Sequence, residues 1–121
     1  MTEHQAVLTA VNWWSDKIRE GLAEQQLEKF REKLMGLICS EISTDLAMGY
    51  DGTNVWITCH IYPCEILRDA AVQAGIPESN FPKLIDMLIQ SVDGGVHYEV
   101  CVHDGFGPCY KKLLQMNESE E

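Results

Sequence analysis

Residues 54–62 read Asn54-Val55-Trp56-Ile57-Thr58-Cys59-His60-Ile61-Tyr62, and their side chains alternate between two kinds of position. A period of two is typical of a β-strand that buries one face. The alternation directs Val55, Ile57, Cys59 and Ile61 toward a core, and Asn54, Trp56, Thr58 and His60 toward a wetter face. Because segments with helical spacing lie on both sides of this strand, the chain is expected to combine helices with a sheet.

The segments next to this strand predict a hairpin and a helix. Upstream, Ile42, Thr44, Leu46 and Met48 alternate from Glu41 onward, and Gly49-Tyr50-Asp51-Gly52-Thr53 has the composition of a turn, so we expect a strand over 42–48 that pairs with 54–62. Downstream, Pro63 ends the strand. The alanine-rich stretch 65–74 predicts a third helix that closes at Gly75, ahead of Pro77.

A second hairpin is expected near the C-terminus. Residues 83–92 fit either a helix or a strand, and the turn Asp93-Gly94-Gly95 favours a strand. Residues 97–103 alternate clearly, with Val96, Tyr98, Val100 and Val102 on one face and His97, Glu99, Cys101 and His103 on the other. Pro108 can occupy the first position of a short last helix that runs through Leu113-Leu114.

The first 40 residues predict two helices that form a hairpin. Thr2 and Gln5 resemble a capping box, and Val7, Val11, Trp14 and Ile18 then repeat at helical spacing until Gly21. Leu27, Phe30, Leu34 and Leu37/Ile38 form a second apolar stripe. Trp14 lies on the first stripe and is assigned to the core, which leaves Trp13 for the neighbouring helix or a partner.

The sum of these elements is an α+β fold: an N-terminal helical hairpin and an antiparallel sheet of about four strands in two β-hairpins, with the helices packed on one face. No linker or repeat divides the chain, so residues 1–116 are expected to form a single domain. Residues 117–121, Asn117-Glu118-Ser119-Glu120-Glu121, are expected to form an acidic disordered tail.

The charge of the chain is strongly negative and unevenly distributed. The 121 residues carry 19 acidic and 9 basic side chains, a net charge of −10. Residues 41–104 hold ten acidic and two basic residues, which accounts for −8 of that total. This balance disfavours generic attraction to nucleic acid or to anionic lipid. The absence of a long apolar run and of a signal segment predicts a cytoplasmic protein with five reduced cysteines.

The cysteines and histidines are the main candidates for a metal site or a catalytic site. The set comprises Cys59, His60, Cys64, Cys101, His103 and Cys109, whose spacings match none of the common zinc patterns. If the strand runs are neighbours, His60, Cys101 and His103 meet on the outer face and become candidate metal ligands. Cys109, after Gly105-Phe106-Gly107-Pro108, is a candidate nucleophile with His103 nearby. Packed or surface side chains are the simpler interpretation, and no cofactor is expected.

The leading hypothesis is a non-catalytic interaction protein that docks on a basic surface of a partner protein. Its candidate contact residues are Trp56, an aromatic among polar neighbours, and carboxylates expected near strand ends and turns: Asp45, Asp51, Asp86, Asp93, Glu99 and Asp104. Two other interpretations of these features stay open, namely that the charge serves only solubility and that Trp56 lies under a helix. The alternative function is a Cys/His metal-binding protein or a cysteine-dependent enzyme that uses Cys109. Spare aromatics and a strand edge also suggest a homodimer.

Three short motifs are similar to those of small uncharacterised proteins carried by phages and other mobile elements of gut bacteria. They are Val11-Asn12-Trp13-Trp14-Ser15-Asp16-Lys17, then Ala70-Ala71-Val72-Gln73-Ala74-Gly75-Ile76 with Phe81-Pro82, and Gly105-Phe106-Gly107-Pro108. The resemblance implies no site residues. Small acidic proteins of that setting often resemble anti-defence inhibitors, including anti-CRISPR proteins, that cover a nucleic-acid-binding groove on their target.

Overall fold

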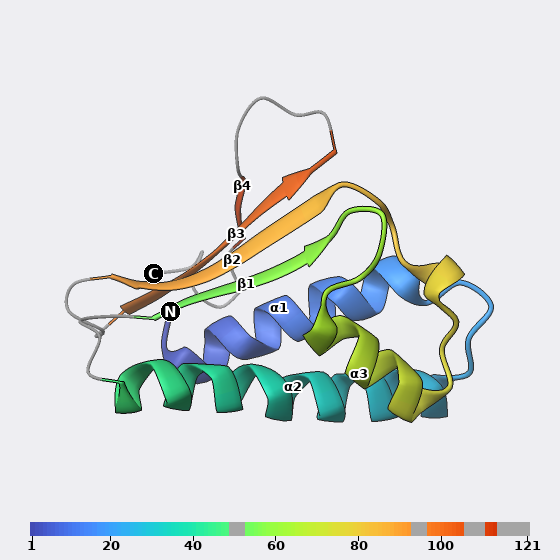
Figure 1. Ribbon diagram of the computed structural model, residues 1–121, viewed down its shortest axis with the longest axis horizontal. Helices are drawn as coiled ribbons and strands as arrows, with labels where there is room; N and C mark the ends of the chain where they lie inside the picture. The colour runs from blue at the N-terminus through green and yellow to red at the C-terminus, as the bar shows by residue number, and fades with distance from the viewer. Residues whose placement is uncertain (49–52, 93–96, 106–110, 114–121) are drawn as a thin grey trace.

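The computed structural model describes residues 1–48, 53–92, 97–105 and 111–113. Its helices are α1 (Glu3–Ile18), α2 (Glu24–Ala47) and α3 (Glu65–Ala74), followed by a short 3-10 turn, η1 (Glu78–Asn80). Its strands are β1 (Asn54–Cys59), β2 (Ile85–Val92), β3 (His97–Asp104) and β4 (Lys111–Leu113). They form one antiparallel sheet in the order β1-β2-β3-β4 (Figure 1). The predicted α+β fold with its N-terminal helical pair is confirmed.

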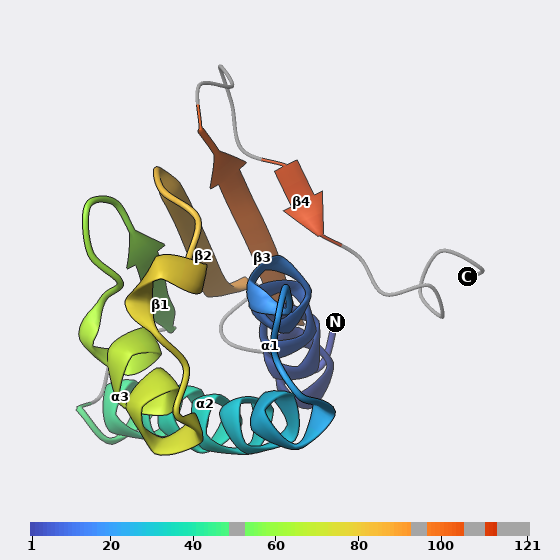
Figure 2. The same ribbon diagram turned by 90° about the vertical axis from the view of Figure 1, so that its right-hand side faces the viewer.

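The three helices cover one face of the sheet (Figures 1 and 2). α1 packs against β2 and β3, α2 contacts β1, and α3 packs on α2. No described element lies against the opposite face, which we call the outer face. The helices therefore supply one large apolar layer against the inner face of the sheet.

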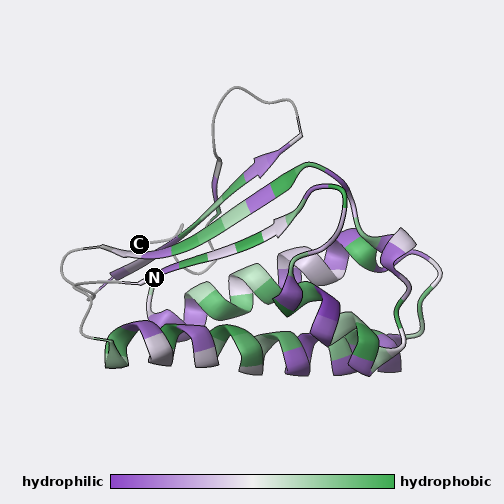
Figure 3. Ribbon diagram, in the orientation of Figure 1, coloured by the Kyte–Doolittle hydropathy of each residue, from purple (hydrophilic) through white to green (hydrophobic). Residues whose placement is uncertain are grey.

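The core lies between the helices and the inner face of the sheet. Apolar and polar residues alternate along the strands (Figure 3), as a sheet with one buried face requires. Phe81, in the segment before β2, joins the two longer helices, because its ring centroid lies 6.3 Å from that of Trp14 and 6.0 Å from that of Phe30. The strand residues that are buried in this core are Val55, Ile57, Cys59, Ile85, Met87, Ile89, Tyr98, Val100 and Val102.

The start of α1 follows from its first residues. Thr2 is the N-cap, its hydroxyl accepts from the Gln5 amide at 3.1 Å, and the Gln5 side chain accepts from the Thr2 amide at 2.8 Å. This is the capping box expected from the sequence. Trp14 is fully buried and Trp13 half-buried, as expected, with their ring centroids 5.0 Å apart.

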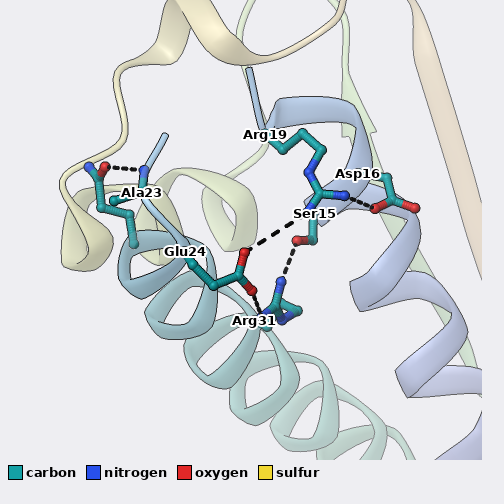
Figure 4. Close-up of polar contacts among 7 residues, drawn as sticks. Ser15, Asp16, Arg19, Ala23, Glu24 and Arg31 are labelled. Carbon is teal, nitrogen blue, oxygen red and sulfur yellow. Dashed lines mark hydrogen bonds and ion pairs between the residues drawn. The ribbon is translucent and has the colours of Figure 1, made fainter. Parts of the chain in front are cut away.

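A polar contact joins α1 to α2. Ser15 is buried on α1, and Arg31 of α2 donates to its hydroxyl at 2.9 Å (Figure 4). The same guanidinium donates to Glu24 at 2.9 Å, while Arg19 donates to Asp16 at 3.1 Å. The buried hydroxyl thus has a partner, which removes the free-energy cost of burying it alone.

The strand expected over 42–48 is wrong, and so is the first hairpin. Residues 42–47 form the last turns of α2, Met48 is its C-cap, and β1 pairs with β2 instead. Ile42 continues the buried helical stripe of Leu34 and Ile38 at four-residue spacing, whereas Leu46 and Met48 are exposed. In a segment this short, apolar residues two apart are compatible with a helix as well as with a strand. The apolar stripe of Leu34 and Ile38 upstream continues through Ile42 and favours the helix.

Two further expectations are wrong. Ile61 was assigned to the core face, but β1 ends at Cys59 and the Ile61 side chain is 77% exposed in the loop that follows. The short helix expected to end at 113–114 is replaced by β4, which pairs Lys111 with Val102 and Leu113 with Val100. Residues 111–113 form backbone hydrogen bonds with the edge of β3, whereas the first turn of a short isolated helix is unfavourable to nucleate.

Candidate functional site

The outer face presents three rows of side chains that run across the sheet. Strand register and alternation place these residues on the face that the helices leave open. Lys112 of β4 extends the middle row, because it pairs with Cys101. Read across β1, β2 and β3, the rows are Asn54–Gln90–Glu99, Trp56–Leu88–Cys101 and Thr58–Asp86–His103.

Trp56 is the largest apolar side chain on the outer face. It is 51% exposed, and its cross-strand neighbour Leu88 is half-buried. The row that carries Trp56 lies between the row of Glu99 and the row of Asp86. The Trp56 indole therefore lies in the middle row, on the edge strand β1, with Asp86 one row away on β2 and Glu99 one row away in the other direction on β3. An exposed aromatic among polar side chains is typical of an interface anchor.

Asp86 is paired with His60 at the end of β1. Nε2 of His60 lies 2.6 Å from Oδ1 of Asp86, and the Asp86 side chain is 27% exposed. His103 of β3 is the cross-strand neighbour of Asp86 on the other side. One carboxylate of the outer face thus contacts the imidazole of His60 and has His103 as its cross-strand neighbour.

Glu99 is held by a lysine from the edge strand. Lys112 Nζ lies 2.9 Å from Glu99 Oε1, and Gln90 donates to the other oxygen at 3.4 Å. The hydrogen bond from Lys112 and the charge of that lysine hold the pKa of Glu99 below its ordinary value. The same hydrogen bond raises the pKa of Lys112. This end of the outer face keeps both charges across the neutral range.

The carboxylates expected to form one patch are divided by the fold. Asp86 and Glu99 share the outer face, but Asp45 lies on α2, in the helical layer. Asp104 ends β3 and its carboxylate lies 3.6 Å from Lys17 Nζ of α1. Asp51 and Asp93 lie outside the described residues. Of the four expected carboxylates that the structure describes, two therefore lie on the outer face.

The candidate metal ligands come near one another without forming a described site. His60 and His103 flank Asp86, and Cys101 lies one row away, opposite Leu88. Within residues 1–48, 53–92, 97–105 and 111–113, no group of three or more histidine, cysteine or acidic side chains has a geometry that could hold a metal ion.

Two of the described thiols are poorly suited to nucleophilic attack. Partial burial and the charge of Glu99 raise the pKa of Cys101, so this thiol is protonated at neutral pH. Burial, followed by the charges of Cys64 and Glu78, raises the pKa of Cys59. Cys109, the candidate nucleophile, lies outside the described residues.

The titratable groups of the outer face do not line a described cavity. A hollow of about 400 Å³ opens near the end of β1, lined by Cys59, Ile61, Tyr62, Pro63, Glu78, Ser79, Phe81, Pro82 and Lys83. Neither Asp86, Glu99 nor His103 belongs to its described lining. The side chains of Asp86 and Glu99 are each 27% exposed on the outer face.

Three residues of the outer face were not singled out from the sequence. Leu88 and Gln90 lie in a segment whose helical and strand patterns compete, and Lys112 was assigned to a helix. Once 83–92 is taken as a strand, alternation alone places Asp86, Leu88 and Gln90 on one face. Lys112 had no such signal, because β4 spans only Lys111–Leu113.

Comparison with known proteins suggests no function for this chain, so the proposal below is based on the fold and the outer face. The chain matches no family model, and no curated protein has significant sequence similarity to it. Of the helices in the described part of the chain, none has the length and apolar character that crossing a membrane requires.

Proposed function

We propose that the protein is a non-catalytic interaction protein that docks its outer face on a basic surface of a partner protein. The observation that carries the proposal is the half-exposed indole of Trp56, which lies between the carboxylate rows of Asp86 and Glu99 on a sheet face that no described element covers.

Arginine is the side chain that best matches this face. A guanidinium stacks on an indole and donates two parallel hydrogen bonds to a carboxylate, which a lysine ammonium cannot do. The side chains of Asp86 and Glu99 are each 27% exposed, and an arginine that binds them would share or replace the contacts of Asp86 with His60 and of Glu99 with Lys112 and Gln90. Charge-assisted bonds are stronger in such a setting than on a fully exposed surface.

The wider charge of the chain supports the same partner. The net charge of −10 attracts a basic surface over the distance of a Debye length, about 8 Å at physiological salt. Such attraction raises the association rate more than the final affinity. A nucleic-acid-binding groove rich in arginine is one surface of this kind, and a protein that covers it acts as an inhibitor, in line with the phage-type anti-defence role.

The proposal places the protein in a reducing, cytoplasmic setting. Cys39, Cys59, Cys64 and Cys101 are free thiols, and an odd total of five cysteines is typical of a compartment that keeps thiols reduced.

Titration with a short arginine-rich peptide and a lysine peptide of equal length tests the proposal. Amide chemical shifts recorded by NMR should move mainly on the outer face, more strongly with the arginine peptide and less at high salt. Trp56→Ala should weaken binding by roughly tenfold, the loss typical of a central interface aromatic. Asp86→Asn combined with Glu99→Gln should weaken it further.

A matched charge control lies on the opposite side of the molecule. Glu28→Gln combined with Glu32→Gln removes the same two charges from the exposed surface of α2 and should change the affinity by less than twofold. If this control weakens binding as much as the outer-face pair, or if shifts spread over the helices as well, the peptide senses only net charge and the proposal fails.

A further inference from the structure

The hollow near the end of β1 has the size and the lining of a small-ligand site. Its volume of about 400 Å³ lies within the range of roughly 300–1,000 Å³ that such sites have. Among its lining residues, Cys59 and Phe81 are buried, whereas Ile61 and Tyr62 are 77% and 65% exposed. A ligand that covers the two exposed side chains removes apolar surface from water, which favours binding.

Contacts within the chain hold both segments that line the hollow. The loop after β1 is closed by a β-bridge between Cys59 and Pro63. On the other side, η1 is attached to the end of α1, because the side chain of Asn80 donates to the Ile18 carbonyl at 2.9 Å. A ligand that enters such a hollow does not have to order its walls, which lowers the entropy cost of binding.

The polar groups of the lining are mainly hydrogen-bond donors. Its acidic residue, Glu78, has a cation beside it, because Arg68 Nε lies 3.5 Å from Glu78 Oε1. Within the part of the chain that the structure describes, Lys83 has no ion-pair partner, and the hydroxyls of Tyr62 and Ser79 have no hydrogen-bond partner. One uncompensated positive charge and two hydroxyls are therefore available to an acceptor, next to the apolar side chains.

The backbone beside Lys83 has an unfavourable conformation. Leu84 has a φ of 62°, in the left-handed region, which disfavours a residue with a bulky side chain. Its carbonyl accepts from the Gly105 amide at 2.8 Å, a contact that helps to hold this conformation. The chain turns at this point, so Lys83 lines the hollow instead of extending β2, which begins at Ile85. Backbone strain of this kind is concentrated at binding and catalytic sites.

We propose that this hollow binds a small molecule with an apolar body and a single carboxylate. The apolar body covers Ile61 and Tyr62, and the carboxylate accepts from Lys83. One lysine matches one negative charge, so a carboxylate fits better than a phosphate group, which carries about −1.5 to −2 at pH 7. The inference does not depend on the proposed docking of the outer face, because the carboxylates of that face do not belong to the described lining.

Two probes of closely similar shape, indole-3-acetate and its uncharged amide, indole-3-acetamide, test the proposal. During titration, amide chemical shifts recorded by NMR should change in residues 59–63 and 78–83 and should reach saturation. The carboxylate should bind roughly tenfold more tightly than the amide, the effect of one hydrogen bond to a charged group. Acetate at the same concentration measures the shifts that any anion causes, and these should not saturate.

Three variants separate the contribution of the charge from that of the apolar wall. Lys83→Met should weaken the carboxylate roughly tenfold and change the affinity of the amide by less than about twofold, so the variant no longer distinguishes the probes. Lys29→Met, the same change at an exposed lysine of α2, should leave both affinities within about twofold of the wild type. Ile61→Ala should weaken both probes equally, by roughly threefold, the loss of about one buried methylene.

The three substitutions alter exposed side chains, so the circular dichroism spectra of the variants should match that of the wild type. The proposal is overturned by equal affinity of the two probes for the wild type, or by an effect of Lys29→Met as large as that of Lys83→Met. It is also overturned if no shift in the two lining segments saturates at about 10 mM of the carboxylate probe, well above a millimolar dissociation constant.

Discussion

Two glycines should respond in opposite directions to the same substitution. Gly75 ends α3 with a φ of 70°, in the left-handed region, where a Cβ is unfavourable. Gly36 lies inside α2 with helical backbone, and a Cβ built on it meets nothing within 4 Å. We expect Gly75→Ala to destabilise the protein and Gly36→Ala to stabilise it.

The magnitudes follow from the backbone rather than from contacts. A Cβ on Gly75 would lie 3.8 Å from Nε2 of Gln26, an ordinary contact, so only the conformational strain counts. The left-handed conformation costs alanine about 1–2 kcal/mol, and its smaller unfolded-state entropy returns about 0.4–1 kcal/mol. Gly75→Ala should therefore cost roughly 0.5–1 kcal/mol. Gly36→Ala should add roughly 0.5–1 kcal/mol, the helix-interior difference between the two residues.

Urea unfolding of the two variants and the wild type measures this difference. The two variants should differ by roughly 1–2 kcal/mol in the free energy of unfolding, which separates their midpoints by about 0.5–1 M at the slope expected for a chain of this size. The slopes themselves should agree. If Gly75→Ala proves as stabilising as Gly36→Ala, the left-handed end of α3 does not exist in solution and the reasoning is refuted.

Two other measurements address the polar contacts. Because Lys112 holds the pKa of Glu99 below its ordinary value, the pair stabilises the fold above the unfolded pKa of Glu99, and this stability is lost as the pH falls through the lower folded value. Glu99→Gln should therefore lower the urea midpoint at pH 7 but bring it closer to that of the wild type at pH 3, and an equal loss at both values would contradict this. In the helical layer, Arg31→Ala leaves the buried Ser15 hydroxyl without its partner and should cost about 1–3 kcal/mol, whereas the same change in a Ser15→Ala background should cost clearly less. Additive losses would contradict the contact between them.

Most of the fold could be predicted because each element carries a local signal. The capping box of Thr2 and Gln5 begins α1, and Gly75 ends α3. The alternation of 54–59 and of 97–103 identifies β1 and β3 and the face that each buries. These signals depend on backbone geometry and on period, both of which act within a few residues.

The errors fall where a local pattern fits two structures. Residues 42–48 alternate, but they also continue the four-residue spacing that buries Leu34, Ile38 and Ile42 in α2. β4 has only three residues, too few to show any period. The helix over 42–47 depends on the apolar stripe that begins at Leu34, and β4 depends on pairing with β3. A stretch of a few residues shows neither the stripe nor the partner strand.

Local patterns in the chain predict the types of the longer elements and the inward residues of β1 and β3, and composition gives the excess of negative charge. Hydrophobic period and turn residues suffice for these elements, because both act between residues that are close in sequence. Which carboxylates share a face depends instead on how the strands and helices pack. Asp86 and Glu99 share the outer face with Trp56 because β1, β2 and β3 are adjacent in register, while α2 carries Asp45 into the helical layer and Lys17 of α1 pairs with Asp104. Strand order and helix packing bring together residues that are far apart in the chain. Counting charges along the sequence therefore does not show which of them share a face.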